Sequence, residues 1–280
     1  MKRSMLKKVI SIGLVLGMSL SLVGCGQAKT EKKDESSKKT ITIGGTSISE
    51  VTYEAIKPVF EKEGFKTKFV MFDANPVVLE ACNSKEVDMA LGQHREYVKS
   101  FDSSNNADLQ MVKPYGYYTG IGLYSDKYKN IKDIPNGGKI AIMNDAMNMN
   151  IALRILEENG LIKINKDVKT ATIADITSNP KNLKIVDMDQ AQTVTALKDM
   201  DAACVFFTHM SNAGLDPTKY LARDTQMIKY PMGVIVKKEN VNSDWAVAFA
   251  KCFKDKTVQD KINKAFPGVF EFYENDKQAD

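Results

Sequence analysis

Few side chains in this chain have the types and the spacing that catalysis requires. The sequence holds two histidines, His94 and His209, and neither belongs to an HExxH zinc motif. It has no GxSxG motif, and no cysteine stands at a spacing from a histidine that suggests a nucleophile or a zinc site. The sequence therefore favours ligand binding over catalysis, with no metal and no cofactor. An enzyme assembled from scattered residues is the alternative.

The stretch from residue 139 to residue 164 has the pattern of a ligand-binding βα unit. The apolar run Ile140–Met143 suits a buried strand, and Asn144-Asp145 ends it with residues that favour turns and helix N-caps. Apolar residues then recur at helical spacing until Gly160. The N–H groups at the start of such a helix would favour an anionic group. An ordinary structural βα unit explains this segment equally well.

The first 24 residues have the features of a bacterial lipoprotein signal peptide. A basic start precedes an apolar run of 15 residues, Val9–Val23, which is shorter than the roughly 20 that a membrane span needs. The sequence Leu22-Val23-Gly24-Cys25 resembles the lipobox, whose cysteine receives diacylglycerol. We therefore expect Cys25 to anchor the protein to the bacterial cell membrane, facing the extracytoplasmic side. The alternative is an uncleaved anchor helix.

Residues 25–39 are expected to form a flexible tether, because they contain no large apolar side chain that could pack. The net charge of +4 is accounted for by the four basic residues of the signal segment, so the mature chain is balanced. A balanced charge argues against nucleic acid as a partner. Besides Cys25, the chain has Cys82, Cys204 and Cys252, an odd number without CxxC spacing. No disulfide framework is expected, although one pair stays open.

The pattern of apolar runs predicts strands that alternate with helices, which is typical of a largely parallel sheet. Strands are predicted at 40–43, 66–72, 88–91, 121–124, 140–143, 183–186, 202–207 and 232–237. Helices are predicted at 53–63, interrupted around Pro58, and at 76–84, 191–197 and 243–266. Gly44-Gly45 follows the first strand, but without a GxGxxG motif or a P-loop lysine it does not predict a nucleotide site.

Five segments together carry a resemblance to a known family: GQHREYV (92–98), GIGLYSDKYKNIKDIPNGGKIAIMND (120–145), ALRILEENGLI (152–162), KDMDAA (198–203) and NAGLDP (212–217). The chain resembles the NlpA/MetQ family of lipoproteins, the substrate-binding components of methionine-type ABC importers, from Thr40 to about Phe272. The resemblance implies an α/β protein of the periplasmic-binding-protein type II fold, with two α/β lobes joined by two crossover segments. Residues 40–125 plus 228–280 would form lobe 1, and residues 126–227 would form lobe 2.

The same resemblance implies that the protein binds a small-molecule ligand between its lobes and delivers it to an ABC permease and its ATPase subunit. The expected ligand is methionine or a related, more apolar compound. The alternative is a surface lipoprotein that uses this scaffold for protein contacts or sensing rather than transport.

The predicted pocket departs from the family's pattern. Ile151 stands where methionine-binding members have an arginine that holds the ligand's carboxylate, and Phe206 and Met232 stand where they have asparagines. Without a charged partner in the pocket, a ligand with a buried carboxylate loses several kcal/mol of binding free energy. We therefore expect a ligand that is more apolar than a free α-amino acid, or differently charged. Arg154, one turn further along, is the alternative partner for a carboxylate.

Two further positions differ from the family. Gly92 replaces an aromatic residue and Val78-Leu79 replaces a Pro-Asn pair, whereas Gln93, His94 and Tyr97 match. His94 would hydrogen-bond the ligand, and the alternative is a purely structural histidine. The residues predicted to bind the ligand are Gln93, His94, Tyr97, Tyr115, Asn144, Asn148, Ile151, Phe206 and Met232.

Overall fold

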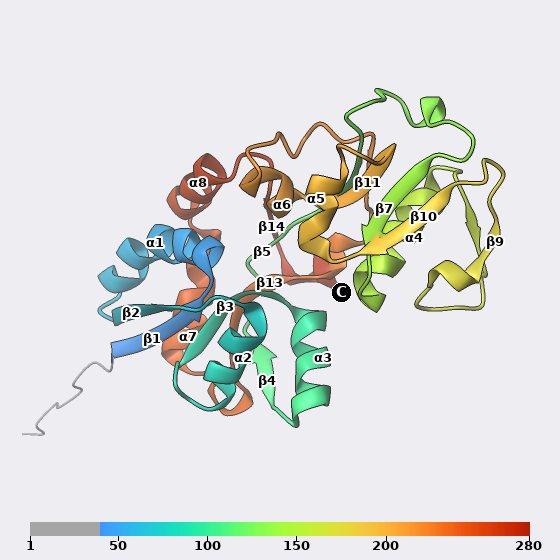
Figure 1. The fold of residues 1–280 in the computed structure, drawn as a ribbon. Coiled ribbons are helices and arrows are strands. Elements are labelled where there is room, and N and C mark those ends of the chain that lie inside the picture. Colours follow the sequence, from blue (N-terminus) through green and yellow to red (C-terminus); the bar gives the residue numbers. More distant parts are fainter. Residues whose placement is uncertain (1–39) are drawn as a thin grey trace, which may run out of the picture. The chain divides into compact units, whose positions relative to one another are not determined.

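The computed structural model of the protein describes residues 40–280, which form two larger β-sheets with helices packed against them (Figure 1). The predicted signal peptide, the lipidation site Cys25 and the tether of residues 25–39 lie outside the described residues. Within residues 40–280, no helix is both long enough and apolar enough to cross a membrane.

The first sheet has seven strands in the order β14-β5-β13-β3-β1-β2, with β4 paired to β13. Strands β2, β1 and β3 pair in parallel, whereas β13 runs antiparallel to β3, β4 and β5. The strands are β1 (Thr40–Gly45), β2 (Lys66–Met71), β3 (Met89–His94), β4 (Leu109–Met111), β5 (Tyr117–Tyr118), β13 (Met232–Lys237) and β14 (Glu271–Phe272).

The second sheet has five strands in the order β10-β7-β11-β6-β12. Strand β7 pairs in parallel with β10 and β11, and β6 runs antiparallel to β11 and β12. The strands are β6 (Ile121–Tyr124), β7 (Lys139–Met143), β10 (Lys184–Met188), β11 (Ala202–Phe206) and β12 (Ala222–Arg223). A separate hairpin pairs β8 (Lys163–Ile164) with β9 (Ile176–Ser178).

Each larger sheet therefore combines a parallel core with an antiparallel strand that borders a crossing between the sheets. We call the first sheet with its helices the first lobe, and the second sheet with its helices the second lobe. The chain changes sheet between β5 and β6 and again between β12 and β13. Strand β6 pairs only within the second sheet, so its residues 121–124 belong there by pairing. The division of the lobes at 125/126 and 227/228 stays a prediction.

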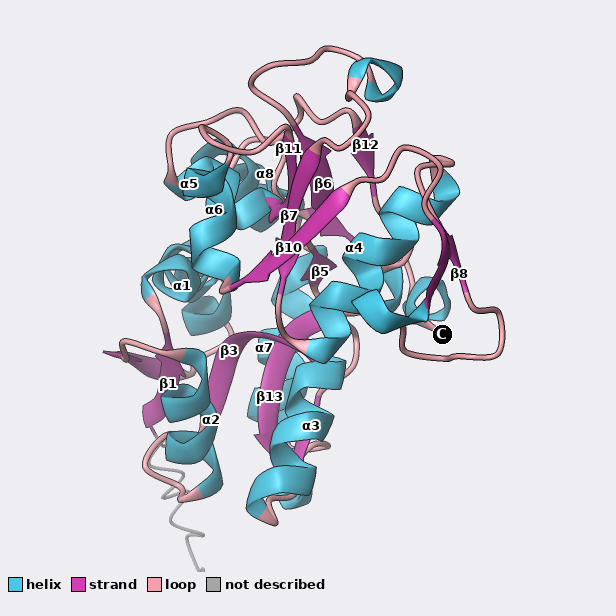
Figure 2. Ribbon diagram, turned by 45° about the vertical axis from the view of Figure 1, so that its right-hand side comes forward, coloured by secondary structure: helices cyan, strands magenta, loops and turns pink. Residues whose placement is uncertain are grey.

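Helices cover both faces of each sheet (Figure 2). In the first lobe, α1, α7 and α8 pack against one face, and α2 and α3 against the other. In the second lobe, α4 packs on one face and α5 and α6 on the other. The helices are α1 (Ser47–Lys62), α2 (Asn75–Asn83), α3 (Arg95–Asn105), α4 (Ala146–Glu158), α5 (Thr193–Ala196), α6 (Phe207–Asn212), α7 (Asp244–Lys251) and α8 (Lys256–Ala265).

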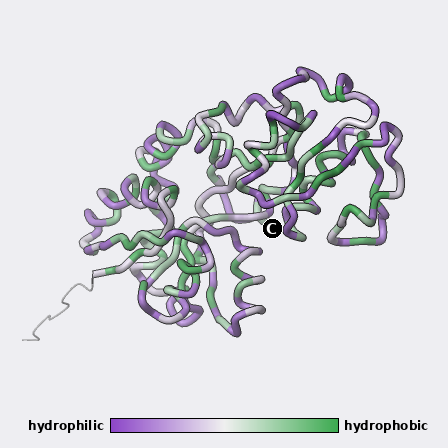
Figure 3. Tube along the Cα trace, viewed as in Figure 1, coloured by the Kyte–Doolittle hydropathy of each residue, from purple (hydrophilic) through white to green (hydrophobic). Residues whose placement is uncertain are grey.

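One hydrophobic cluster continues from the first lobe into the second. It joins Ile43 and Phe60 of the first lobe to Val205 and Phe207 of the second, and all four are buried. Figure 3 shows hydrophobic segments running through both sheets, whereas the outer loops are hydrophilic. Cys82, Cys204 and Cys252 are free thiols, and all three are buried.

Three elements differ from the sequence prediction. The predicted interruption of α1 at Pro58 is wrong, because the helix runs through this residue and is held by buried side chains that include Tyr53, Ile56 and Phe60. The single predicted helix at 243–266 is two helices, because Asp255 caps α8 by accepting hydrogen bonds from the backbone of Thr257 and Val258. Helix α3 was not predicted, since it buries only one side chain.

Asp224 fixes both chain crossings between the lobes. This carboxylate is 5% exposed, and its Oδ2 accepts a hydrogen bond of 2.8 Å from the backbone N–H of Ile121, where β6 begins. Its Oδ1 accepts from the backbone N–H groups of Gln226 and Met227, on the way to β13. A single side chain thus satisfies three backbone donors on the two segments that join the lobes.

Replacing Asp224 should destabilise the protein more than replacing an exposed aspartate. Asp224→Ala leaves three backbone donors without their acceptor, so we expect unfolding by urea to show a loss of about 2–4 kcal/mol. Asp224→Asn keeps one acceptor oxygen, so its unfolding free energy should fall less than that of Asp224→Ala. The control Asp216→Ala removes an exposed turn contact to Thr218 and should cost about 1 kcal/mol or less. Equal losses for the two alanine variants would contradict the role of Asp224.

Candidate functional site

His94 lies at the point where β3 ends and α3 begins. Its Nδ1 accepts a hydrogen bond of 3.0 Å from the backbone N–H of Tyr97 and so caps α3. The ring is packed edge-on between Tyr97 and Tyr230, with ring centres 6.1 and 5.5 Å away. Burial lowers the pKa of His94 to about 4, although the carboxylates of Glu96 and Asp145 oppose this shift. His94 is therefore neutral near pH 7, and since Nδ1 is an acceptor, Nε2 carries the hydrogen.

Asp145 occupies the corresponding position in the second lobe, where β7 ends and α4 begins. Its carboxylate caps α4, since Oδ1 accepts from the backbone N–H of Asn148 at 3.1 Å and Oδ2 from the side-chain Nδ2 of Asn148 at 3.0 Å. The cap is therefore Asp145 and not Asn144. The same carboxylate acts to raise the pKa of both His94 and Tyr97, and Figures 1 and 2 show the starts of α3 and α4 side by side where the lobes meet.

Two buried amide oxygens near these caps have no hydrogen-bond donor within the described part of the chain. Gln93 is 2% exposed, and its Nε2 donates to Asn75 Oδ1 at 3.0 Å while its Oε1 has no partner. Asn148 is 8% exposed, and its Oδ1 is equally unpartnered. Buried polar atoms normally find a partner, so each of these two oxygens marks a position where a hydrogen-bond donor of a ligand would be stabilised.

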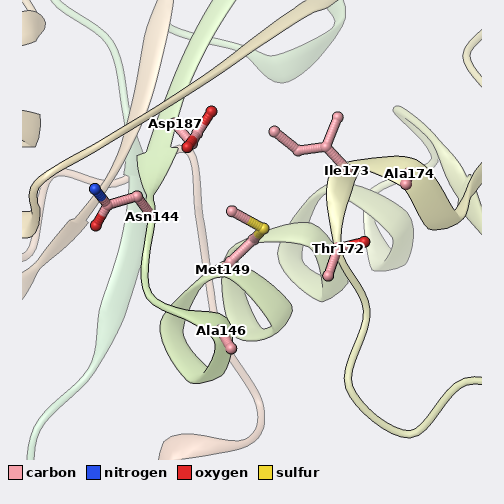
Figure 4. Close-up of a pocket in the computed structure, with 7 residues that line it drawn as sticks. All are labelled: Asn144, Ala146, Met149, Thr172, Ile173, Ala174 and Asp187. Carbon is pink, nitrogen blue, oxygen red and sulfur yellow. The ribbon is translucent and has the colours of Figure 1, made fainter.

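A cavity of about 340 Å³ opens at the carboxyl ends of β7 and β10 (Figure 4). In Figure 4 the side chain of Met149 lies between Asn144 and Asp187 on one side and the segment 172–174 on the other. Crevices at the ends of parallel strands are where α/β proteins bind ligands. The lining residues are Asn144, Ala146, Met149, Thr172, Ile173, Ala174 and Asp187. Asn144 is exposed at this cavity.

The other predicted site residues divide into two groups. Tyr97 and Met232 lie with His94, because Tyr97 contacts its ring and Met232 pairs with it across β3 and β13. Ile151 is fully buried in the hydrophobic cluster beneath α4, and Phe206, 8% exposed, belongs to the same cluster. A ligand contact for any of these residues stays a prediction.

Tyr115 lies in a separate network at the C-terminus. It is 6% exposed, and its hydroxyl accepts a hydrogen bond of 3.1 Å from Arg95 Nη1. Arg95 also donates to the backbone carbonyls of Lys229 and Ala279. The network therefore ties α3 to the second crossing and to the end of the chain. Sequence reasoning did not single out Arg95, although the matched segment at 92–98 contains it.

Each of the three arginines in the described residues is already engaged. Besides Arg95, Arg154 bonds Glu157 at 2.8 Å and the carbonyl of Val168 at 3.2 Å. Arg223 pairs with Glu271 at 2.7 Å across the two sheets. The alternative in which Arg154 holds a ligand carboxylate would require it to give up both bonds.

Gly92 explains why an aromatic residue does not fit before Gln93. Its φ of +103° lies in a region that residues with side chains rarely adopt. An added Cβ would lie 2.3 Å from Ser49 Oγ, and Ser49 is buried and donates to the carbonyl of Leu91. Strand β3 also carries an irregularity against β13 at this point. The glycine and the serine therefore fit each other.

A family model described as NlpA lipoprotein matches residues 41–271. The chain belongs to this family. The D-methionine-binding lipoprotein MetQ of Yersinia pestis is 29% identical over 267 residues, which cover 94% of this chain and 96% of the relative. The same protein of Escherichia coli K12 is also 29% identical, over 269 residues.

Solved structures place this NlpA-family chain among substrate-binding proteins. A nutrient-binding protein of Burkholderia cenocepacia, bound to methionine, is 30% identical with a TM-score of 0.73, over 83% of this chain and 99% of that one. The substrate-binding protein of a methionine transporter from Streptococcus pneumoniae is 30% identical with a TM-score of 0.72, over 84% and 95%. The predicted type II periplasmic-binding fold, with two α/β lobes and two crossings, is thus confirmed.

The stability of the protein should depend on the protonation of His94. The unfolded chain takes up a proton below the ordinary histidine pKa of 6.5, whereas folded His94 does so only near pH 4. Stability is therefore fully present above 6.5 and is lost as the pH falls from there toward 4. Between about pH 7 and about pH 5, we expect wild type to lose about 1–2 kcal/mol relative to His94→Gln in urea unfolding.

The difference in unfolding free energy between wild type and His94→Gln reports the titration of His94 alone. Burial lowers the pKa of His209 as well, but that residue is present in both proteins and cancels. A stability difference that stays constant across this pH range would show that folded His94 titrates like an exposed histidine.

A side chain at position 92 should destabilise the protein through contact with Ser49. Gly137 is the matched control, because its φ is also positive, at +74°, but nothing lies near its missing Cβ. Gly137→Ala should therefore cost about 1 kcal/mol for the backbone alone. Gly92→Ala should cost about 2–4 kcal/mol, since Ser49 must also move. Thermal unfolding of both variants measures the difference. Equal costs would show that the contact with Ser49 does not contribute.

Proposed function

We propose that this NlpA-family lipoprotein is the solute-binding component of an ABC importer and delivers methionine or a related, more apolar compound to its permease. The observation that carries the proposal is the meeting of the two lobes at His94 and Asp145, beside two buried oxygens that have no donor among residues 40–280. A relative aligned over 96% of its length is named as a D-methionine-binding lipoprotein, and a nutrient-binding protein of the same fold was solved with methionine bound. Such proteins bind and release their solute without making or breaking a bond.

The geometry supports a cycle in which the lobes close on the solute and open to release it. Within residues 40–280 the chain passes between the two lobes twice, and Asp224 bonds the backbone at both crossings. A ligand that contacts both lobes favours the closed arrangement by the difference between its affinities for the two states. The permease, together with its ATPase subunit, would then accept the closed, loaded form.

The chain would be held at the membrane by lipid on Cys25. The signal segment and the lipobox-like sequence support this anchor, and the relatives are named as lipoproteins. The tether of residues 25–39 would let the folded body reach a permease in the same membrane. The protein would therefore face the extracytoplasmic side.

Uptake measurements in the source bacterium test this function. Deleting the gene should reduce uptake of labelled methionine or methionine derivatives, and the full chain should restore it. Mass spectrometry of any solute released from the purified full chain identifies what it carries. Unchanged uptake of every compound, with no solute released, would argue against an import role.

Replacing the lipidation site should separate anchoring from binding. In Cys25→Ala, we expect the protein to leave the membrane fraction, because a lipid chain supplies its attachment. Ligand affinity should stay at the wild-type value, since all the predicted ligand-binding residues lie between Gln93 and Met232. Cys82→Ala is the control, because this buried thiol belongs to the core of the first lobe and should leave the anchor intact. A wild-type protein whose mass shows no lipid at Cys25 would refute lipidation at this residue.

A further inference from the structure

Helix α4 carries two asparagines that are equally buried but differently bonded. Asn148 and Asn150 are each 8% exposed. The Oδ1 of Asn150 accepts a hydrogen bond of 2.9 Å from the backbone N–H of Ala171, so this side chain has a structural role. The Oδ1 of Asn148 has no donor in the described part of the chain. Asn148 is therefore the asparagine whose side-chain oxygen could accept a hydrogen bond from a ligand.

The orientation of the Asn148 amide is fixed by Asp145. Its Nδ2 donates to the Asp145 carboxylate at 3.0 Å, so turning the amide over would bring two oxygens together. The unpartnered atom is therefore an acceptor, and it calls for a donor on the ligand. Gln93 offers a second unpartnered acceptor in the first lobe, in the residue before His94.

The charges around these acceptors disfavour a carboxylate. Asp145 already occupies the positive end of α4, which would otherwise attract an anion. Asp187 adds another carboxylate group at the neighbouring cavity. The arginines Arg95, Arg154 and Arg223 are bonded elsewhere, as described above. A ligand with a free carboxylate would meet carboxylates of the protein there without a guanidinium partner.

We propose that the solute bound where the lobes meet has no free carboxylate and presents N–H donors to Asn148 Oδ1 and Gln93 Oε1, as an amide or amine derivative of an amino acid does. The Nε2–H of neutral His94 would donate to the carbonyl of such an amide. This inference rests on the proposed function, because it takes the methionine-like part of the solute from there. It changes the class of substrate from amino acids to their carboxylate-free derivatives.

Matched pairs of compounds test the proposal. The full chain, purified in detergent, is titrated calorimetrically with L-methionine and L-methioninamide, and with L-leucine and L-leucinamide. The two members of each pair differ only in the carboxylate. We expect the amide of at least one pair to bind tenfold or more tightly than its acid. Equal or tighter binding of the acid, or no binding by either pair, overturns the proposal.

Variants of α4 locate the effect. Asn148→Leu removes the unpartnered oxygen, and we expect affinity for the amide to fall about tenfold or more. Asn150→Leu is the control: it should lower the melting temperature, because Ala171 loses its acceptor, but keep the preference for the amide. Gln93→Leu tests the second acceptor in the same way. It replaces Asn148→Leu as the test if that variant does not fold. An undiminished preference in both Asn148→Leu and Gln93→Leu would exclude these oxygens.

The uptake experiment keeps this proposal separate from the proposed function. If L-methionine binds more tightly than L-methioninamide and methionine uptake depends on the gene, the import function is supported. The proposal that the ligand lacks a carboxylate is then wrong. If neither pair of compounds binds while uptake of another solute depends on the gene, the proposed preference for carboxylate-free ligands is also overturned. The import function is then still supported.

Discussion

The double crossing of the chain is the constraint on which the rest of the structure depends. In each lobe the strand that follows a crossing, β6 or β13, runs antiparallel to the parallel strands and pairs within the interior of its sheet. The lobes therefore cannot fold as two separate stretches of sequence. Asp224 satisfies backbone donors on both crossings with one buried carboxylate.

The meeting of the starts of α3 and α4 determines the chemistry of the site. In both lobes a side chain caps the helix, His94 for α3 and Asp145 for α4, so the first backbone donors of the helices are partly used. A neutral imidazole and a carboxylate then remain close to the two buried amide oxygens. This combination suits a ligand that donates hydrogen bonds, and it differs from the arginine-centred arrangement that the family resemblance implies.

Several departures from the family's pattern are consistent with one another. Ile151 fills the hydrophobic cluster beneath α4, where a charged group would be buried without a partner. Gly92 leaves space for Ser49, whose hydroxyl bonds the carbonyl of Leu91. Each of these two residues therefore matches its surroundings in this fold: Ile151 an apolar cluster, and Gly92 the side chain of Ser49.

The sequence by itself determined the class of fold and most of its elements. Strands such as β6, β7 and β13 were predicted close to their observed bounds, because a buried strand requires a continuous apolar run. The family resemblance supplied the two lobes and the binding role. Helix α3, which buries one side chain, and strands β5 and β14, which have two residues each, left no such signal.

Only the tertiary structure decided which polar side chains are satisfied. Asn148 and Asn150 are the same residue type two positions apart, and the sequence cannot tell them apart. Ala171, which pairs with one of them, is distant in the chain. The same holds for Asp224, whose partner Ile121 lies 103 residues away. Hydrogen-bond satisfaction depends on contacts between distant segments, and local patterns of residues carry no record of them.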